Sequence, residues 1–253
     1  MDLKIDIISA SYGKKKIIGD ISVNIPSGSF TAVIGRNGSG KSTLLYAIDG
    51  IIPFEGSIMA GDADISSASA SERARLVSIM LQQTKNPHIT VEELVSFGRR
   101  PYRGFGEAMT KEDLDAVERA ISDAELSEIR GCYLDEISGG ELRRSYFGMI
   151  LAQNTPIVLL DEATAFLDTD REMRFLDMMD AKRRADGKTV ISVMHDLSAA
   201  MKYADNVMLI DGGRLIFFGS VEDILKTDLI ERTFSVKRYT ACTDCGERIF
   251  FSN

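Results

Sequence analysis

Three short runs of aliphatic and β-branched residues place the strongest constraint on how this chain can fold. The runs are Phe30 to Ile34, Ile157 to Leu160 and Val190 to Met194. Apolar side chains at nearly every position are typical of strands buried on both faces of a parallel sheet, and the runs are too short for buried helices. The residues that follow the runs are Gly35, Asp161 and His195. Because ligands bind at the carboxyl ends of parallel strands, we expect these three ends to share one site.

The segments around these strands predict further β and helical parts. Strand-like alternation near the N-terminus, over Leu3 to Ala10, Ile17 to Ile25 and Gly56 to Ala60, predicts an antiparallel β part. Between Thr110 and Ile129 the pattern changes to the helical spacing of an amphipathic helix. Its apolar positions are Leu114, Val117, Ala120, Ile121 and Ala124.

These segments predict one α/β domain over residues 1–253. Its core comprises residues 1–83 and 155–226, with a helical lobe inserted over 84–154 and a C-terminal tail over 227–253. Helices over Phe175 to Ala185 and Leu197 to Tyr203 are expected between the core strands.

Charge and hydropathy argue against two classes of protein. The formal net charge is -8 and the chain has no basic run, which argues against binding along nucleic-acid backbones. No apolar run approaches the length that spans a bilayer, and the charged N-terminal residues do not resemble a signal peptide. We expect a soluble chain that reaches a membrane only through another protein.

The three cysteines do not predict a disulfide framework. Cys132 stands apart, whereas Cys242 and Cys245 form a CxxC near the C-terminus. Half of a zinc site is weak evidence, because tetrahedral zinc takes four ligands. Two reduced thiols without metal are the favoured interpretation.

The residues after the first run, Gly35 to Thr43, fit the phosphate-binding P-loop. A strand precedes them and a helical pattern, Leu44 to Ile48, follows, which is the context that this motif requires. Glycines allow backbone N–H groups to surround phosphate oxygens, Lys41 reaches the terminal phosphates, and the Ser42 hydroxyl binds Mg²⁺. The alternative, a chance Gly-rich turn, does not explain the Lys-Ser-Thr sequence.

Two carboxylates follow the second run. Asp161 stands where a Walker B aspartate would organise Mg²⁺, and Glu162 could orient or deprotonate an attacking water. Adjacent acidic residues at a strand end are also common helix caps, so the P-loop is what favours the catalytic interpretation.

A second anion-binding pattern lies in the predicted lobe. Ser138, Gly139, Gly140 and Glu141 precede a helical segment, Leu142 to Leu151. A hydroxyl and backbone donors at a helix start suit an anion, although Ser138 also suits a simple N-cap. Two phosphate sites in one chain require either two nucleotides or a dimer.

Taken in order, the P-loop, Ser138 to Glu141 and Leu159 to Asp168 resemble the ATPase subunits of ABC transporters. The resemblance extends from Tyr12 to about Leu225. It implies a RecA-like P-loop core with an inserted helical lobe, and a head-to-tail dimer with two ATP molecules and Mg²⁺ at the seam. Ala163, Leu81 and Glu141 depart from the usual residues, but no catalytic group is missing.

The resemblance also implies roles for single residues. Tyr12 matches the aromatic that stacks on adenine. Gln82 matches the glutamine that links Mg²⁺ and the attacking water to the membrane subunit, and the adjacent Gln83 is the alternative for this role. Asp168 matches the residue that bridges the dimer seam, and His195 the switch histidine. The candidate nucleotide-binding residues are Tyr12, Gly35, Asn37, Gly38, Ser39, Gly40, Lys41, Ser42, Thr43, Ser138, Gly139, Gly140 and Asp168. The candidate metal ligands are Ser42, Gln82 and Asp161, and the candidate catalytic residues are Glu162, His195, Gln82 and Lys41.

Two further segments resemble the ATPases of iron-siderophore, haem and vitamin B12 importers. They are Thr90 to Tyr102 and Asp211 to Leu225. This implies membrane permease subunits, a second copy of the chain and, indirectly, an extracytoplasmic substrate-binding protein as partners, at the cytoplasmic face of the membrane. Nucleic acid is not an expected partner. A soluble ABC ATPase for assembly or repair, and a nucleotide sensor without turnover, remain alternatives.

The segment from Gln82 to Tyr102 joins the predicted metal site to the lobe. Asn86-Pro87 and Arg99-Arg100-Pro101 predict an exposed loop there. We expect this segment to face the permease, with Arg99 and Arg100 on the docking surface. A merely solvated basic pair is the alternative.

Overall fold

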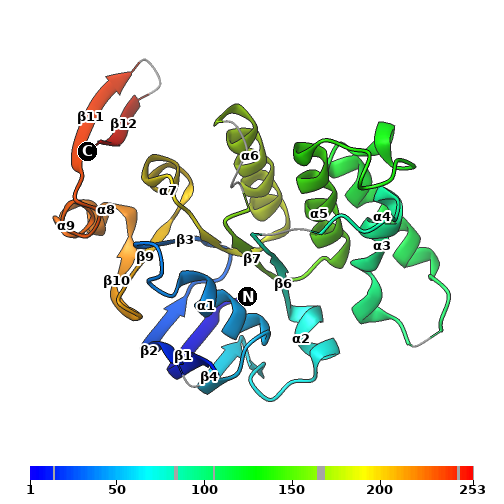
Figure 1. The fold of residues 1–253 in the computed structure, drawn as a ribbon, viewed down its shortest axis with the longest axis horizontal. Helices are drawn as coiled ribbons and strands as arrows, with labels where there is room; N and C mark the ends of the chain where they lie inside the picture. Colours follow the sequence, from blue (N-terminus) through cyan, green and yellow to red (C-terminus); the bar gives the residue numbers. More distant parts are fainter. Residues whose placement is uncertain (14, 83–84, 105, 164–168, 244–245, 253) are drawn as a thin grey trace.

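The computed structural model describes residues 1–13, 15–82, 85–104, 106–163, 169–243 and 246–252. Its described part contains a six-stranded sheet in the order β10-β9-β3-β8-β7-β6 (Figure 1). The three apolar runs form β3, β8 and β7, and β3 pairs in parallel with β8 and β9. The predicted parallel sheet is therefore confirmed. Its strands are β3 (Phe30–Ile34), β6 (Val77–Met80), β7 (Ile157–Asp161), β8 (Thr189–Val193), β9 (Asn206–Asp211) and the antiparallel β10 (Arg214–Ser220).

Alternate residues of these strands belong to two different cores. In β3, Phe30, Ala32 and Ile34 join the cluster that includes the lobe, whereas Val33 faces the cluster around α1 (Lys41–Asp49). The strand is buried at every position because both of its faces are covered. Helices α6 (Thr169–Asp186) and α7 (Leu197–Tyr203) supply residues to the first cluster.

A second, antiparallel sheet covers the other side of α1. The described residues pair it in the order β2-β1-β4-β5. Strand β1 pairs with both neighbours, and Ile5 lies opposite Val23 of β2 and Ile58 of β4. These three side chains pack with Leu44 and Ile48 of α1, so the P-loop helix is held between two sheets (Figure 1). The predicted N-terminal β part is confirmed, and its strands are β1 (Leu3–Tyr12), β2 (Lys15–Ile25), β4 (Phe54–Ala60) and β5 (Ala63–Asp64).

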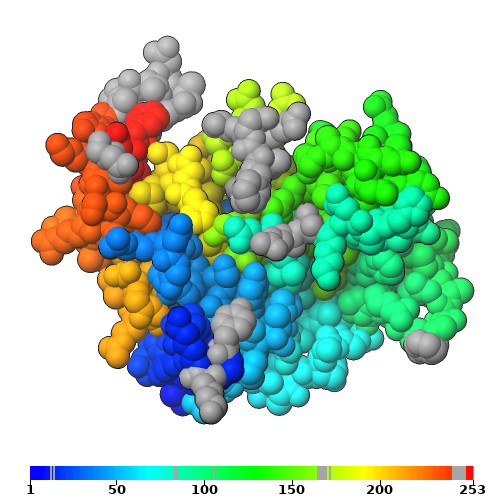
Figure 2. All heavy atoms as spheres, viewed as in Figure 1, coloured from blue at the N-terminus to red at the C-terminus, as the bar shows by residue number. Residues whose placement is uncertain are grey.

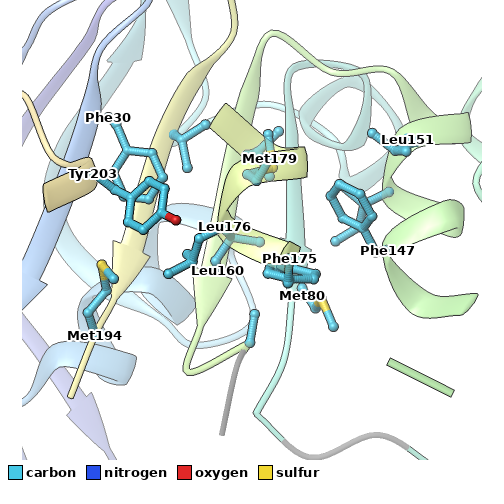
Figure 3. Packing of buried hydrophobic residues seen from close by; sticks show 14 of the residues in the cluster. Phe30, Met80, Phe147, Leu151, Leu160, Phe175, Leu176, Met179, Met194 and Tyr203 are labelled. Carbon is cyan, nitrogen blue, oxygen red and sulfur yellow. The ribbon is translucent and has the colours of Figure 1, made fainter. Parts of the chain in front are cut away.

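The lobe is helical, as predicted, and lies at one end of the molecule (green in Figure 2). Its described elements are α3 (Val91–Phe97), η1 (Arg100–Tyr102), α4 (Lys111–Asp123), η2 (Ser127–Ile129) and α5 (Gly139–Gln153). α2 (Ala70–Leu76) leads from the antiparallel sheet to β6. Phe147 of α5 packs on Phe175 of α6, with ring centroids 4.9 Å apart, and joins the lobe to the core (Figure 3).

Two details of the predicted lobe helix are wrong. The helix α4 ends at Asp123 rather than near Ile129, because the backbone turns at Glu125, which has a positive φ of 55°. Leu114 is 54% exposed, whereas Val117, Ala120 and Ile121 are buried. Leu114 therefore lies outside the packed stripe of this helix.

Arg99 does not lie on an exposed docking surface, and that prediction is wrong. Its side chain is 7% exposed and donates from Nε to Asp113 at 2.9 Å and from Nη1 to the carbonyl of Ala152 at 2.9 Å. The guanidinium also lies 4.0 Å from the ring centroid of Tyr102. Arg99 thus ties α3, α4 and α5 together, and only its neighbour Arg100 is exposed.

The C-terminal residues are more ordered than a tail. They form α9 (Leu229–Phe234) and a hairpin of β11 (Lys237–Thr243) and β12 (Gly246–Ser252), after α8 (Val221–Leu225). Phe251 packs against the first core cluster. The side chain of Cys242, and Cys245, lie outside the described residues, while Cys132 is a free thiol. Within the described ranges, no helix combines the length and apolar character that crossing a membrane requires.

Candidate functional site at the strand ends

The P-loop curls tightly between β3 and α1. A Cβ at Gly35 would lie 2.1 Å from the carbonyl oxygen of Ile210, so only glycine fits there. Gly38 has a φ of 76°, which favours glycine, and a Cβ there would meet open space. Lys41 Nζ donates to the carbonyls of Gly35 and Arg36 at 2.9 and 3.1 Å. The lysine is therefore folded back against the loop.

The buried ammonium group of Lys41 is placed to bind an anion. The side chain is buried, and burial lowers the pKa of its ammonium, although the negative charges of Glu162 and Asp161 oppose this shift. Neighbouring carboxylates thus do not fully offset the cost of burying the charge. A phosphate placed against Lys41 would supply the missing compensation.

Asp161 ends β7 and faces the P-loop helix. Its Oδ1 accepts from Ser42 Oγ at 2.7 Å and its Oδ2 accepts from Tyr46 Oη at 2.6 Å. The carboxylate is fully buried. These partners belong to α1 and not to the helix that follows β7, so the cap interpretation does not account for Asp161.

Glu162 is the meeting point of two other strand ends. Gln82, which follows β6, donates from Nε2 to Glu162 Oε2, and His195 Nε2, which follows β8, lies 2.5 Å from Glu162 Oε1. Glu162 has a φ of 48°, a conformation that a non-glycine residue adopts only under local constraint. His195 is 47% exposed and is not a core histidine. The expected convergence of strand ends on one site is observed for Asp161, Glu162, Gln82 and His195.

Gln82, Glu162, His195, Lys41 and Ser42 line one hollow of about 540 Å³, whereas Asp161 is buried and is linked to this hollow through its hydrogen bond with Ser42. The lining residues are Lys15, Ile17, Asn37, Gly38, Gly40, Lys41, Ser42, Thr43, Gln82, Glu162 and His195. In the loop, the buried hydroxyl of Ser39 has no hydrogen-bond partner among the residues that the structure describes. Ser42, Asp161 and Gln82 offer the oxygen ligands that Mg²⁺ prefers, with the single carboxylate typical of sites completed by phosphates. The residues present therefore fit Mg²⁺ with a nucleotide.

Ser138 caps α5, as predicted. Its hydroxyl accepts from the N–H of Glu141, and the Glu141 carboxylate accepts from the Ser138 N–H at 2.8 Å, which forms a capping box. Ser138 and Gly140 line a different cavity, of about 680 Å³, whose described walls also include Arg143, Arg174 and Phe175. The Ser138 motif and the P-loop thus serve separate hollows within one chain.

A side chain of α5 holds the segment that carries Gln82. Arg143 donates from Nη1 to the carbonyl of Leu81 at 3.0 Å and from Nη2 to the carbonyl of Gln82. Tyr146 Oη donates to the carbonyl of Lys85 at 2.7 Å. The helix that Ser138 caps is therefore bonded directly to the segment that carries Gln82.

Some predicted site residues cannot be placed. Asp168 and Gln83 lie outside the described residues, and of Tyr12 only the backbone, at the end of β1, is described. Tyr46 and Arg143 are parts of this site that the sequence did not predict. The signal for Tyr46 was its helical spacing of four residues from Ser42, whereas Arg143 had no signal because its partners are backbone carbonyls.

Comparisons with known proteins identify the family of this chain. Residues 18–165 match the family model described as ABC transporter. The petrobactin import ATP-binding protein FatE of Bacillus anthracis is 35% identical over 237 residues, which cover 93% of this chain and 94% of FatE. The ferric enterobactin transport ATP-binding protein FepC of Escherichia coli (strain K12) is 34% identical, over 91% of this chain and 86% of FepC.

A solved structure gives the same fold. A metal-chelate type ABC transporter in an inward-facing conformation superposes with a TM-score of 0.85 at 20% identity, covering 99% of this chain and 96% of that chain. At this identity the likeness supports the fold alone. The family model covers more than half of the chain and the relatives share about a third of its residues, so this chain belongs to the ABC transporter family of ATP-binding proteins.

Proposed function

We propose that this chain binds and hydrolyses ATP to drive uptake of an iron-siderophore complex through a membrane permease. The observation that carries the hydrolytic part is the convergence of Gln82 and His195 on Glu162, beside the Ser42–Asp161 pair. The substrate class rests on the relatives, which import petrobactin and transport ferric enterobactin. Because these relatives are described as import and transport proteins, an assembly or repair factor is not favoured.

Each side chain in the hollow has a chemical task in this proposal. The P-loop backbone and Lys41 bind the β- and γ-phosphates, while Ser42, Asp161 and Gln82 would hold Mg²⁺. The metal supplies positive charge that offsets the charge developing on the phosphate oxygens. Glu162 would orient the attacking water and accept its proton, and His195 would stabilise the charge of the γ-phosphate.

The separate hollows support a head-to-tail pair of chains. The P-loop surrounds one side of a nucleotide, and the hydroxyl of Ser138 with Gly139 and Gly140 offers donors for the opposite side. Since Ser138 and Gly140 line another cavity of the same chain, the donors of this motif would act on the nucleotide of a second copy. Asp168 would bridge the seam, and Tyr12 would stack on adenine.

The permease would contact the chain beside Gln82. A displacement of this segment by the permease would move the start of α5 through Arg143 and Tyr146, and would move Glu162 through Gln82. The chain would thus act on the cytoplasmic face of the membrane, and an extracytoplasmic binding protein would affect it only through the permease.

Growth on ferric siderophore as the iron source tests this proposal. In a host that lacks its own copy of the gene, the parent chain should restore growth and uptake of labelled iron, and Lys41→Ala should not. Phosphate release by the purified parent is measured in parallel. ATP turnover with no effect on iron uptake would reject the substrate class and retain the ATPase.

A further inference from the structure

Both oxygens of the buried Asp161 carboxylate accept hydrogen bonds from one helix, α1. Ser42 Oγ donates to Oδ1 at 2.7 Å, and Tyr46 Oη donates to Oδ2 at 2.6 Å. Ser42 and Tyr46 are four residues apart on α1, and therefore lie on the same face of that helix. We propose that Tyr46 is a positioning residue that sets the orientation of Asp161 toward Mg²⁺, an inference that rests on the proposed metal-binding role of Asp161.

A second donor is needed because of what Ser42 does. In the proposed site the Ser42 hydroxyl faces the metal as well as Asp161, so its hydrogen bond alone is a poor anchor for the carboxylate plane. Tyr46 holds the oxygen that lies away from Ser42 and prevents rotation about the last side-chain bond of Asp161. Mg²⁺ requires near-ideal octahedral geometry, so it is sensitive to such a rotation.

Tyr46 lies on the same helix, α1, as the phosphate-binding residues. Lys41, Ser42 and Tyr46 belong to one rigid helix whose apolar face is packed between the two sheets. The helix that binds the phosphates therefore also fixes the carboxylate on β7. The ring of Tyr46 packs against the second core cluster, a task that phenylalanine would perform equally well. The hydroxyl is the part of the side chain that carries the positioning role.

The variant Tyr46→Phe tests the inference, because it keeps the ring and removes only the hydroxyl. Equilibrium binding of ATP is measured in EDTA and across a Mg²⁺ series, and Mg²⁺ half-saturation of hydrolysis is measured at saturating ATP. We expect unchanged binding in EDTA and a Mg²⁺ half-saturation raised about 10-fold, as for loss of a group that orients a metal ligand. p-Aminophenylalanine in place of Tyr46, which keeps an N–H donor, should restore much of the Mg²⁺ affinity.

A matched control is available in the same molecule. Tyr203 Oη donates to Asp177 at 2.7 Å, between α7 and α6 and outside the hollow. Tyr203→Phe removes an equivalent Tyr–Asp bond and should leave Mg²⁺ half-saturation at the parent value, whatever its effect on the melting temperature. If Tyr46→Phe also lowers only the melting temperature, Tyr46 has a structural role and the inference is wrong.

Asp161→Asn separates this failure from a failure of the proposed site. If Asp161 organises Mg²⁺, this variant loses the Mg²⁺-dependent gain in ATP affinity. Loss in Asp161→Asn without any shift in Tyr46→Phe would reject the inference about Tyr46 alone. An unchanged Mg²⁺ dependence in Asp161→Asn would reject the metal role of Asp161, and the inference with it.

Discussion

The nucleotide hollow and the helical lobe both contain buried charges, but neighbouring groups compensate these charges to different extents. In the lobe, Asp113 accepts from Arg99 at 2.9 Å. Although burial raises the pKa of Asp113, hydrogen bonds from Arg99 and Thr110 hold it below its usual range. In the hollow, burial lowers the pKa of Lys41 despite Glu162 and Asp161. In the lobe the buried Asp113 is compensated by its protein neighbours. In the hollow the charge of Lys41 is only partly compensated, so it can still pair with an anionic ligand.

This contrast predicts the largest loss of stability in the lobe. Arg99→Ala would leave the carboxylate of Asp113 buried without its partner, which costs about 3–5 kcal/mol of unfolding free energy. Arg100→Ala, at an exposed position, should change it by less than about 0.5 kcal/mol. Urea unfolding of both variants gives the comparison. Equal stabilities would show that the Arg99 pair is not the internal support described above.

In the hollow, removal of a charge should affect ligand binding and not folding. Lys41→Ala should weaken ATP binding and lower turnover by at least about 100-fold, because a preorganised contact to the phosphates is lost. Its melting temperature should stay at or above that of the parent, since an incompletely compensated buried charge is removed. The exposed Lys226→Ala serves as the control. Normal hydrolysis by Lys41→Ala would contradict the P-loop assignment.

Arg143 joins the two regions, and its loss should have an intermediate effect. Arg143→Met keeps much of the side-chain length but releases the carbonyls of Leu81 and Gln82. We expect kcat for ATP to fall roughly 10-fold through displacement of Gln82, with little change in KM. Tyr146→Phe, which releases only the carbonyl of Lys85, should have a smaller effect. A larger loss of kcat in Tyr146→Phe than in Arg143→Met would show that Tyr146, and not Arg143, is the main connection between α5 and the segment of Gln82.

The smallest expected effect is a gain of stability at the end of α1 that lies away from the P-loop. Burial raises the pKa of Asp49, at the end of α1, to about 6, against the opposing charge of Arg73. The folded state therefore loses stability as the pH rises from about 4 to about 6 and this carboxyl ionises. Asp49→Asn should be more stable by about 1 kcal/mol at pH 7, after allowance for partial exposure, and equal to the parent near pH 4. A constant difference across this range would exclude ionisation as the cause.

The sequence could predict features that depend on local patterns, but not pairings between distant elements. The apolar runs marked β3, β7 and β8, and the polar residues after them met at one site, because the ends of parallel strands coincide. Capping at Ser138 followed from a local pattern. Arg99 was misassigned because its partner Asp113 lies on another helix, and no periodicity links the two. Pairings across elements, such as those of Tyr46 and Arg143, required the fold.

The central claim is that one nucleotide needs the P-loop of one chain and the Ser138 motif of another. Glu162→Gln tests it most directly, because it keeps the shape of the site but removes the base and a negative charge. We expect slow hydrolysis and a dimer that holds two nucleotides and that is seen by size-exclusion chromatography only with Mg-ATP. Adding Ser138→Arg should abolish that dimer. A Glu162→Gln protein that remains monomeric in excess Mg-ATP, or that turns over as fast as the parent, would contradict the account.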